Sequence, residues 1–298
     1  NVACGLARLG TNVAFIGRLG SDEFGKGFFK LMSQRGINLN CLQFDSRKPT
    51  RLVLVRRALN GEREFFGFLG DMGDGFADEY IELNEVKAKW ASISKTAKWL
   101  LLGTIPLAKV ISSETLFWIV SESLKANIKI ALDINWRPTF WNQSASPSSS
   151  PSDKVKAKIF QLIKYTSLLK LSKEEAIYFF NTDNPLDISN SLPQKPDIVI
   201  TNGGEAVKWN INTISGITNV FNSPTIIDTT GAGDAFMSGL MHKIINTSNS
   251  IMNKETIQEI ILFSIACGAI VCGSPGAIMP QPMRKDVDQL LASLGSIT

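Results

Sequence analysis

Short apolar runs alternate with longer amphipathic segments over much of the chain, and this alternation restricts the possible folds more than any other feature. The apolar runs have the length and residue types of β-strands, and the segments between them have helical spacing. The expected strands are 12–17, 98–105, 128–135, 168–172 and 197–204, and the expected helices are 22–36, 112–127, 153–167 and 173–181. Continuously apolar strands separated by helices predict an α/β fold with a mostly parallel sheet covered on both faces.

Two stretches depart from this alternation. Residues 50–68 contain two β-type runs around Asn60-Gly61, which is a strong hairpin signal, and we expect this hairpin to project from the main sheet as part of a cover. Residues 142–153 are rich in Ser and Pro. They predict a solvated loop rather than a domain boundary, because the alternation resumes after them.

The composition excludes several classes of protein. With 298 residues, of which 44% are hydrophobic, the chain can bury a large core and is not disordered as a whole. The net charge of +4 comes from scattered Lys and Arg residues, so no nucleic-acid surface is expected, although the charge suits an anionic ligand. No apolar run approaches the length of a membrane span, and no secretory signal opens the sequence.

The cysteine and histidine residues argue against a metal site with Cys or His ligands. Cys4, Cys41, Cys267 and Cys272 stand in apolar surroundings without metal-ligand spacing, so we expect reduced core thiols rather than disulfides or a zinc site. His242 is the only histidine, which argues against a His-based catalytic triad. Any proton transfer is therefore expected to depend on a carboxylate.

The residues after each strand are the first candidates for a binding site, because ligands of parallel α/β sheets sit at the carboxyl ends of the strands. This rule selects Gly103 and Thr104, 133–137, 172–175, 201–204 and 228–234. Asp133, Asn135 and Arg137 alternate along an expected strand end, so they would share one face and converge on phosphates or a metal. The alternative is a strand terminus with a surface arginine.

The stretch IIDTTGAGDAFMSG, residues 226–239, predicts a phosphate cradle. Gly231, Ala232 and Gly233 precede a helical segment, where unpaired backbone N–H groups and the helix dipole favour negative charge. Glycine lets the backbone turn sharply and approach a ligand. Asp234 then stands where it could take a proton from a hydroxyl nucleophile. The alternative is a simple turn with an Asp N-cap.

Several motifs together resemble one family. DTTGAGDAFMSGL resembles the C-terminal signature of the PfkB carbohydrate kinases, which have the ribokinase-like fold. NVACGLARLG followed by FIGRLGSDEFG is similar to the family's N-terminal signature without its leading Gly-Gly. Further similar stretches are LDINWRPTFW, LSKEEA, TNGGEA and CGAIVCGSPGAIMPQP. These motifs occur in the family's order along essentially the entire chain, and they are most similar to cyanobacterial and plant plastid fructokinase-type proteins.

The resemblance implies a role for each candidate residue. Asp234 would be the catalytic base, and the backbone of Gly231, Ala232 and Gly233 would form the anion hole. ATP and Mg²⁺ are the implied cofactors, with K⁺ as the monovalent cation. The residues implied to bind ATP or its phosphates are Thr201, Gly203, Thr230, Asn135 and Arg137.

The remaining implied roles concern cations and the substrate. Glu175 and Asp133 would be associated with Mg²⁺ and Asp228 with the monovalent cation. Glu175 could instead be a first-turn helix acid, and Asp228 could simply cap a turn. Asn1 and Gly103 would lie on the substrate side.

The resemblance also implies the domain organisation. Residues 1–298 would form a single ribokinase-like domain with a small β lid, to which about 45–75 belong. The family places a strand, part of the lid and sugar-binding groups upstream of the residue equivalent to Asn1. We therefore expect residues 1–298 alone to show little activity until an upstream segment is restored, and robust turnover by them would contradict this.

The leading hypothesis is an ATP-dependent sugar kinase that phosphorylates fructose. Many fructokinases carry an Arg shortly after the REF strand, whereas this chain continues REFFGFLGDMG, so the acceptor stays open. The alternatives are a nucleoside or ribose kinase of the same fold and a catalytically silent scaffold protein. The expected partners are a sugar and ATP, with no nucleic acid and no membrane; the resemblance allows a homodimer and suggests the plastid stroma or cytosol, without secretion.

Overall fold

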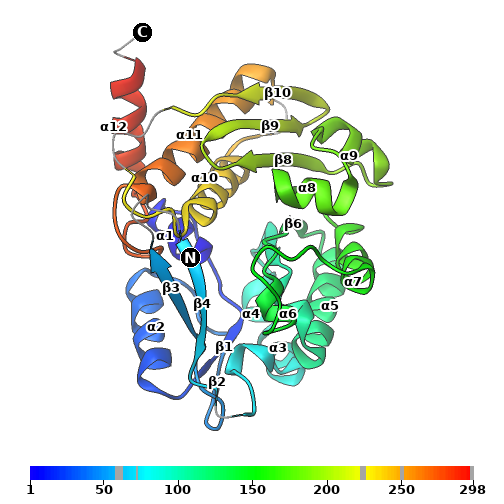
Figure 1. The fold of residues 1–298 in the computed structure, drawn as a ribbon, viewed down its shortest axis with the longest axis vertical. Coiled ribbons are helices and arrows are strands. Elements are labelled where there is room, and N and C mark those ends of the chain that lie inside the picture. The colour runs from blue at the N-terminus through cyan, green and yellow to red at the C-terminus, as the bar shows by residue number, and fades with distance from the viewer. Residues whose placement is uncertain (58–62, 72, 222–225, 249–251, 296–298) are drawn as a thin grey trace.

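The computed structural model describes residues 1–57, 63–71, 73–221, 226–248 and 252–295. Its main sheet has the strand order β10-β9-β8-β7-β6-β5. Strands β10, β9, β8 and β6 of this sheet are labelled in Figure 1. The parallel strands are β5 (Trp99–Gly103), β6 (Lys129–Asp133), β7 (Leu168–Ser172) and β8 (Asp197–Asn202). The sheet continues in antiparallel fashion through β9 (Glu205–Ile211) and β10 (Ile214–Thr218). The predicted α/β fold with a mostly parallel sheet is therefore confirmed.

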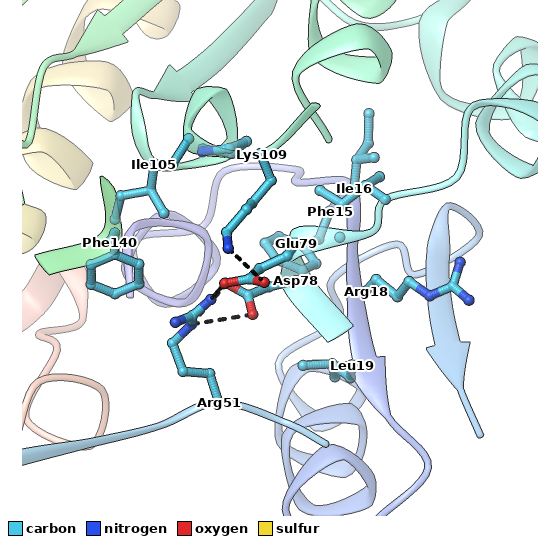
Figure 2. A pocket seen from close by; sticks show the side chains of 14 residues that line it. Phe15, Ile16, Arg18, Leu19, Arg51, Asp78, Glu79, Ile105, Lys109 and Phe140 are labelled. Atoms are coloured by element: carbon cyan, nitrogen blue, oxygen red, sulfur yellow. Dashed lines mark hydrogen bonds and ion pairs between the residues drawn. The ribbon is translucent and has the colours of Figure 1, made fainter. Parts of the chain in front are cut away.

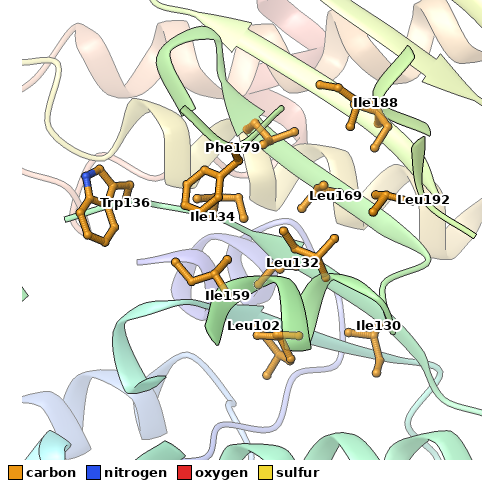
Figure 3. Packing of buried hydrophobic residues seen from close by; sticks show 14 of the residues in the cluster. Leu102, Ile130, Leu132, Ile134, Trp136, Ile159, Leu169, Phe179, Ile188 and Leu192 are labelled. Atoms are coloured by element: carbon orange, nitrogen blue, oxygen red, sulfur yellow. The ribbon is translucent and has the colours of Figure 1, made fainter. Parts of the chain in front are cut away.

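One face of the sheet packs against helices that come from the middle section of the chain. These helices are α5 (Val110–Lys125), α7 (Asp153–Ile163), α8 (Lys173–Phe180) and α9 (Pro185–Ser191). Because strand side chains alternate between faces, Leu132, Leu169 and Ile198 point to the same side and join Ile159 and Phe179 in one core cluster (Figure 3). The helices expected at 112–127, 153–167 and 173–181 are thus present.

The opposite face packs against helices from the two ends of the chain. They are α1 (Val2–Arg8), α10 (Ala232–Asn246) and α11 (Lys254–Cys272), with α12 (Arg284–Gly295) lying against α11. On this face the strand residues Ala131, Leu168 and Val199, among others, pack with Phe236 and Ile261 in a second core cluster. All four cysteines are free thiols, as expected, and three of them are buried.

Helix α11 corrects one expectation. It is long and apolar enough to cross a membrane by length and composition alone, so the view that no apolar run approaches a span was wrong. Half of that apolar stretch is buried inside the fold, where its residues face α10 and the sheet. A helix surrounded by protein is apolar on most sides for that reason.

Two small sheets lie outside the main one (Figure 1). β1 (Gly17–Gly20) pairs with β2 (Leu42–Asp45) in parallel, and α2 (Glu23–Gln34) connects them. The strand expected at 12–17 is displaced: residues 12–16 make one bridge, Ala14 with Asn38, because a turn at Asn40 and Cys41 interrupts the partner before Leu42. Continuous pairing begins only at Gly17.

The expected hairpin forms the second small sheet. β3 (Leu52–Arg57) pairs with β4 (Arg63–Leu69) in antiparallel fashion, separate from the main sheet as expected. Its Asn60-Gly61 turn lies outside the described residues. Short helices fill the connections: η1 (Ala77–Glu79), α3 (Leu83–Lys89), α4 (Ala91–Ser94), η2 (Ile105–Ala108) and α6 (Pro138–Trp141).

Helices α10 and α11 cross closely at Gly239. A Cβ added there would lie 2.9 Å from Cys267 Sγ and 2.9 Å from Ser264 Cα. We expect Gly239→Ala to lower the free energy of unfolding by about 1–3 kcal/mol, because one of the two helices must move. Gly27→Ala is the matched control: Gly27 lies on exposed α2 with nothing within 4 Å of an added Cβ. It should raise stability by about 0.5–1 kcal/mol through helix propensity. Urea denaturation measures both, and equal stability of the two variants would contradict this account of the crossing.

Candidate active site

Helix α10 begins with unpaired backbone donors. Its N-cap, Gly231, has φ 83°, and an added Cβ would lie 2.6 Å from the Cβ of Ala277, so only glycine fits. Ala232 N–H donates to Thr229 O at 3.3 Å. Within the described residues, the N–H groups of Gly231, Gly233 and Asp234 have no acceptor. The predicted cradle therefore keeps donors that can bind an anion.

Asp234 lies beside these donors with its carboxylate accessible. It is the third residue of α10, and no side-chain hydrogen bond caps this helix, so the alternative of an Asp N-cap is wrong. Its Oδ2 accepts a hydrogen bond from Asn1 Nδ2 at 2.7 Å. Two predicted site residues from opposite ends of the sequence are thus in direct contact.

The packing of α1 on α10 creates this contact. Ser238 Oγ lies 3.1 Å from Val2 O, which ties the first turn of α1 to α10. An added Cβ at Gly5 would lie 2.4 Å from Ser238 Oγ, so the two helices touch there through a glycine. Asn1 precedes α1 and is therefore directed at the start of α10.

Asp133 forms a buried ion pair with Lys170. The two residues face each other across β6 and β7, and Lys170 Nζ lies 3.1 Å from Asp133 Oδ1 and 3.2 Å from Oδ2. Burial raises the pKa of Asp133 to about 6, and the Lys170 ammonium opposes this rise. Glu175 and Asp234 contribute to the same rise, which indicates that all three carboxylates share one region.

Glu175 is a first-turn helix acid, which was one of the two interpretations of its sequence motif. It forms a capping box with Ser172, whose N–H donates to Glu175 Oε2 at 2.7 Å. Glu175 Oε1 also accepts the Trp136 N–H at 2.6 Å, which holds the loop after β6 against the start of α8. Glu175 is 6% exposed, and its carboxylate accepts hydrogen bonds from two backbone donors. Its remaining lone pairs can accept hydrogen bonds from water.

The argument that placed Asn135 and Arg137 on one face with Asp133 was wrong. Strand β6 ends at Asp133, and Asn135 has φ 45°, so the period-two alternation stops there. Arg137 is half-buried and donates to Trp136 O at 2.8 Å. Both residues stay near the strand end, in a loop whose path Glu175 holds in place.

The neighbouring strand ends carry the other predicted residues. Thr201 pairs in register with Ser172 at the end of β8, and its Oγ1 lies 3.4 Å from Leu171 O. Gly203 follows in an exposed turn with φ 53°. Gly103 ends β5 opposite Asp133 and lines a cavity of about 170 Å³.

Asp228 connects the loop before α10 to the chain after α11. Its carboxylate accepts N–H bonds from Thr230 at 2.9 Å and from Gly276 at 2.9 Å. Arg8 donates to Gln281 O at 3.0 Å, so the same C-terminal loop is also attached to α1. The turn-capping alternative for Asp228 is thus present, and it helps to position the start of α10.

The sequence analysis did not single out two buried cations. Lys170 is a lysine inside an apolar strand, LLKLS, and such a residue needs a buried partner, so a signal was available. Arg51 lies among the rings of Phe68, Phe76 and Phe140, 4.2 to 4.8 Å from their centroids. No comparable sequence signal marks Arg51, because its three aromatic partners come from distant segments.

Arg51 borders a cavity of about 290 Å³ between the β1 segment and the residues after β5. Figure 2 shows its guanidinium paired with Asp78 and Glu79, and Lys109 paired with Glu79 at 3.3 Å. Because the two basic and two acidic side chains already neutralise one another, we interpret this network as a structural contact rather than a ligand site. It joins the β3–β4 sheet to the body of the protein.

The geometry fits a phosphate-bearing ligand better than a protein-enclosed metal. Within the described ranges, no group of three or more His, Cys, Asp and Glu side chains is placed to hold a metal ion. Mg²⁺ commonly takes one or two carboxylates, waters and substrate phosphates as ligands, which Asp133 and Glu175 can supply in part. The free N–H groups of α10 suit the phosphates of ATP.

Comparisons with known proteins agree with this chemistry. The family model described as pfkB family carbohydrate kinase matches residues 1–284. A probable chloroplastic fructokinase-6 of Arabidopsis thaliana is 28% identical over 98% of this chain and 73% of its own length. A probable fructokinase-7 of the same plant is 30% identical over 99% of this chain and 83% of its own. The crystal structure of a Xylella fastidiosa fructokinase with bound ATP is 25% identical, with a TM-score of 0.81 over 99% of this chain and 89% of that one.

The two glycines at the start of α10 should respond differently to an added methyl group. Gly231→Ala should lower the free energy of unfolding by about 2–4 kcal/mol, because it combines a strained positive φ with the clash against Ala277. Gly233→Ala should change it by less than about 0.5 kcal/mol, since the nearest atom to its Cβ would be Lys170 Nζ at 3.7 Å. Chemical denaturation of both variants tests this, and equal losses would refute the role of Gly231 in the turn.

Proposed function

The chain belongs to the pfkB family of carbohydrate kinases, and we propose that it is an ATP-dependent kinase that transfers the γ-phosphoryl group to a hydroxyl of fructose. The single observation that carries this proposal is at the start of α10. There, unpaired N–H groups and the accessible Asp234 carboxylate occupy the same helical turn. This arrangement supports phosphoryl transfer because an anion site and a proton acceptor lie side by side.

In the proposed reaction, Asp234 accepts the proton of the attacking sugar hydroxyl. The hydroxyl oxygen forms a bond to the γ-phosphorus, and the bond from that phosphorus to the bridging oxygen breaks, so ADP leaves with the electron pair. Asn1 Nδ2 donates to Asp234 Oδ2 and can orient the carboxylate so that the other oxygen faces the hydroxyl. Phosphoryl transfer of this kind depends on positioning and on electrostatic stabilisation.

We propose that the N–H groups of Gly231 and Gly233 stabilise the charge that develops on the transferred group. Both lack an acceptor among the described residues, whereas Ala232 N–H is engaged by Thr229 O at 3.3 Å. Loss of one such donor typically raises a barrier by about 3 kcal/mol. We assign Thr201, Gly203 and Thr230 to the nucleotide, and Asn135 and Arg137 to its phosphates.

The proposal also assigns residues to two cations, Mg²⁺ and K⁺. When bound, Mg²⁺ would neutralise phosphate charge, with Asp133 and Glu175 as its associated carboxylates. We associate Asp228 with a monovalent cation, K⁺, because this buried carboxylate joins the two loops around the start of α10.

The choice of fructose is supported by the names of the related plant proteins, which are fructokinases. Gly103 and Asn1 are our candidates for the acceptor side, because Gly103 borders a cavity and Asn1 contacts Asp234. A nucleoside or ribose kinase and a silent scaffold are the competing functions. We propose the plastid stroma or the cytosol as the location, since one relative is named chloroplastic, and a homodimer as the assembly.

Asp234→Asn should abolish fructose-dependent ADP release by the full-length gene product. A neutral amide cannot accept the hydroxyl proton, so kcat should fall at least about 100-fold while the protein stays folded. Asp187→Asn is the matched control, because Asp187 is also an acid in the first turn of a helix, α9, and is exposed. It should leave activity unchanged. A coupled assay of ADP release over fructose, other hexoses, ribose and nucleosides provides the measurement.

Each outcome of this assay selects one function. Fructose dependence that is lost in Asp234→Asn supports the proposal. ADP release with only ribose or a nucleoside would replace fructose by that acceptor, and no release with any acceptor would favour the scaffold.

A further inference from the structure

Lys170 is a charged residue inside an otherwise apolar strand. Its neighbours Leu169 and Leu171 point into the core cluster beside α7 and α8, so Lys170 points to the opposite face, toward α10. Its side chain is only 9% exposed. Burying an ammonium group is costly unless it is paired and hydrogen-bonded, and a buried ion pair often adds no net stability over apolar residues of similar volume.

The ammonium lies directly against the first turn of α10. Its Nζ is 3.7 Å from the position of a Cβ at Gly233, while 3.1 and 3.2 Å separate it from the two Asp133 oxygens. An ammonium group has three N–H donors. Asp133 takes two of them, and the third has no acceptor within the described part of the chain. This donor is available on the side of the unpaired α10 amides.

The charge balance of the region needs this cation. Lys170 is the cation paired with Asp133, and the carboxylates of Glu175 and Asp234 belong to the same region. Without it, three carboxylates would face an arriving polyanion. Coulomb repulsion at such distances is strong in a partly desolvated site.

We propose that Lys170 binds the phosphates of the nucleotide, acting from beneath the α10 amides while Asp133 holds its ammonium in place. This inference rests on the proposed function and adds a residue to that site. A side chain at position 233 would stand between the ammonium and a ligand at the helix start. The proposal therefore explains why a glycine occupies this position, in addition to the need for its free N–H. The competing explanation is an ion pair that only attaches β6 to β7.

The test measures ADP binding to the full-length gene product by calorimetry, with EDTA present so that metal binding does not contribute. Lys170→Met keeps the length of the side chain and removes its charge, and it should weaken ADP binding at least 10-fold. Lys170→Arg keeps the charge and should recover part of that loss. Lys208→Met is the matched control: Lys208 lies on β9 of the same sheet, its ammonium pairs with Asp183 at 2.7 Å, and its removal should leave ADP affinity unchanged.

Lys170→Met leaves the buried Asp133 without its partner, which destabilises the fold. A second pair of variants therefore separates a loss of ADP binding from a loss of folding. The double variant Lys170→Met/Asp133→Asn removes both charges and is compared with Asp133→Asn alone. Under the proposal the double variant binds ADP at least 10-fold more weakly than the single variant, in which Lys170 remains. Equal binding by these two variants, with only a change in unfolding temperature, would show a purely structural pair and overturn the inference.

The same measurements separate this inference from the function on which it rests. A wild-type protein that neither binds ADP nor releases it from ATP would overturn the proposed function, and the inference with it. Wild-type binding and turnover, together with unchanged ADP affinity in Lys170→Met, would overturn the inference alone.

Discussion

The start of α10 depends on a buried ion pair beneath it. Asp133 and Lys170 join the ends of two central strands, and the ammonium of Lys170 lies 3.7 Å from the place that a Cβ at Gly233, in the first turn of the helix, would occupy. A buried charge pair is sensitive to geometry, because the desolvation penalty is offset only when the partners are well aligned. The strands and the helix are therefore held in one arrangement, and the accessible carboxylate of Asp234 and the free amides follow from it.

The loops around this pair are held by further contacts that each join distant segments. Glu175 takes the N–H of Trp136, and Asp228 takes that of Gly276. On the other side, Arg51 and its acidic partners attach the β3–β4 sheet to the body. A site assembled from many segments needs such bracing, because loops alone would not hold donors and acceptor within the tolerance that phosphoryl transfer requires.

The periodic features were predictable and the local exceptions were not. Strands β5 to β8 and helices α2, α5, α7 and α8 follow from hydrophobic period alone. The strand expected at 12–17 failed because its partner turns at Asn40, which the pattern of residues 12–17 does not contain. The shared face proposed for Asp133, Asn135 and Arg137 failed because Asn135 adopts a positive φ that ends the alternation.

The sequence by itself determined the strand–helix order, the glycine-rich start of α10 and the presence of an acid in its first turn. These are properties of neighbouring residues, and they depend on backbone preferences and side-chain spacing. Only the tertiary structure decided that Asn1 meets Asp234, that Lys170 lies under Gly233 and that Glu175 reaches Trp136. Those contacts join residues 39 or more positions apart, and they exist because the packing of whole helices and strands brings the residues together.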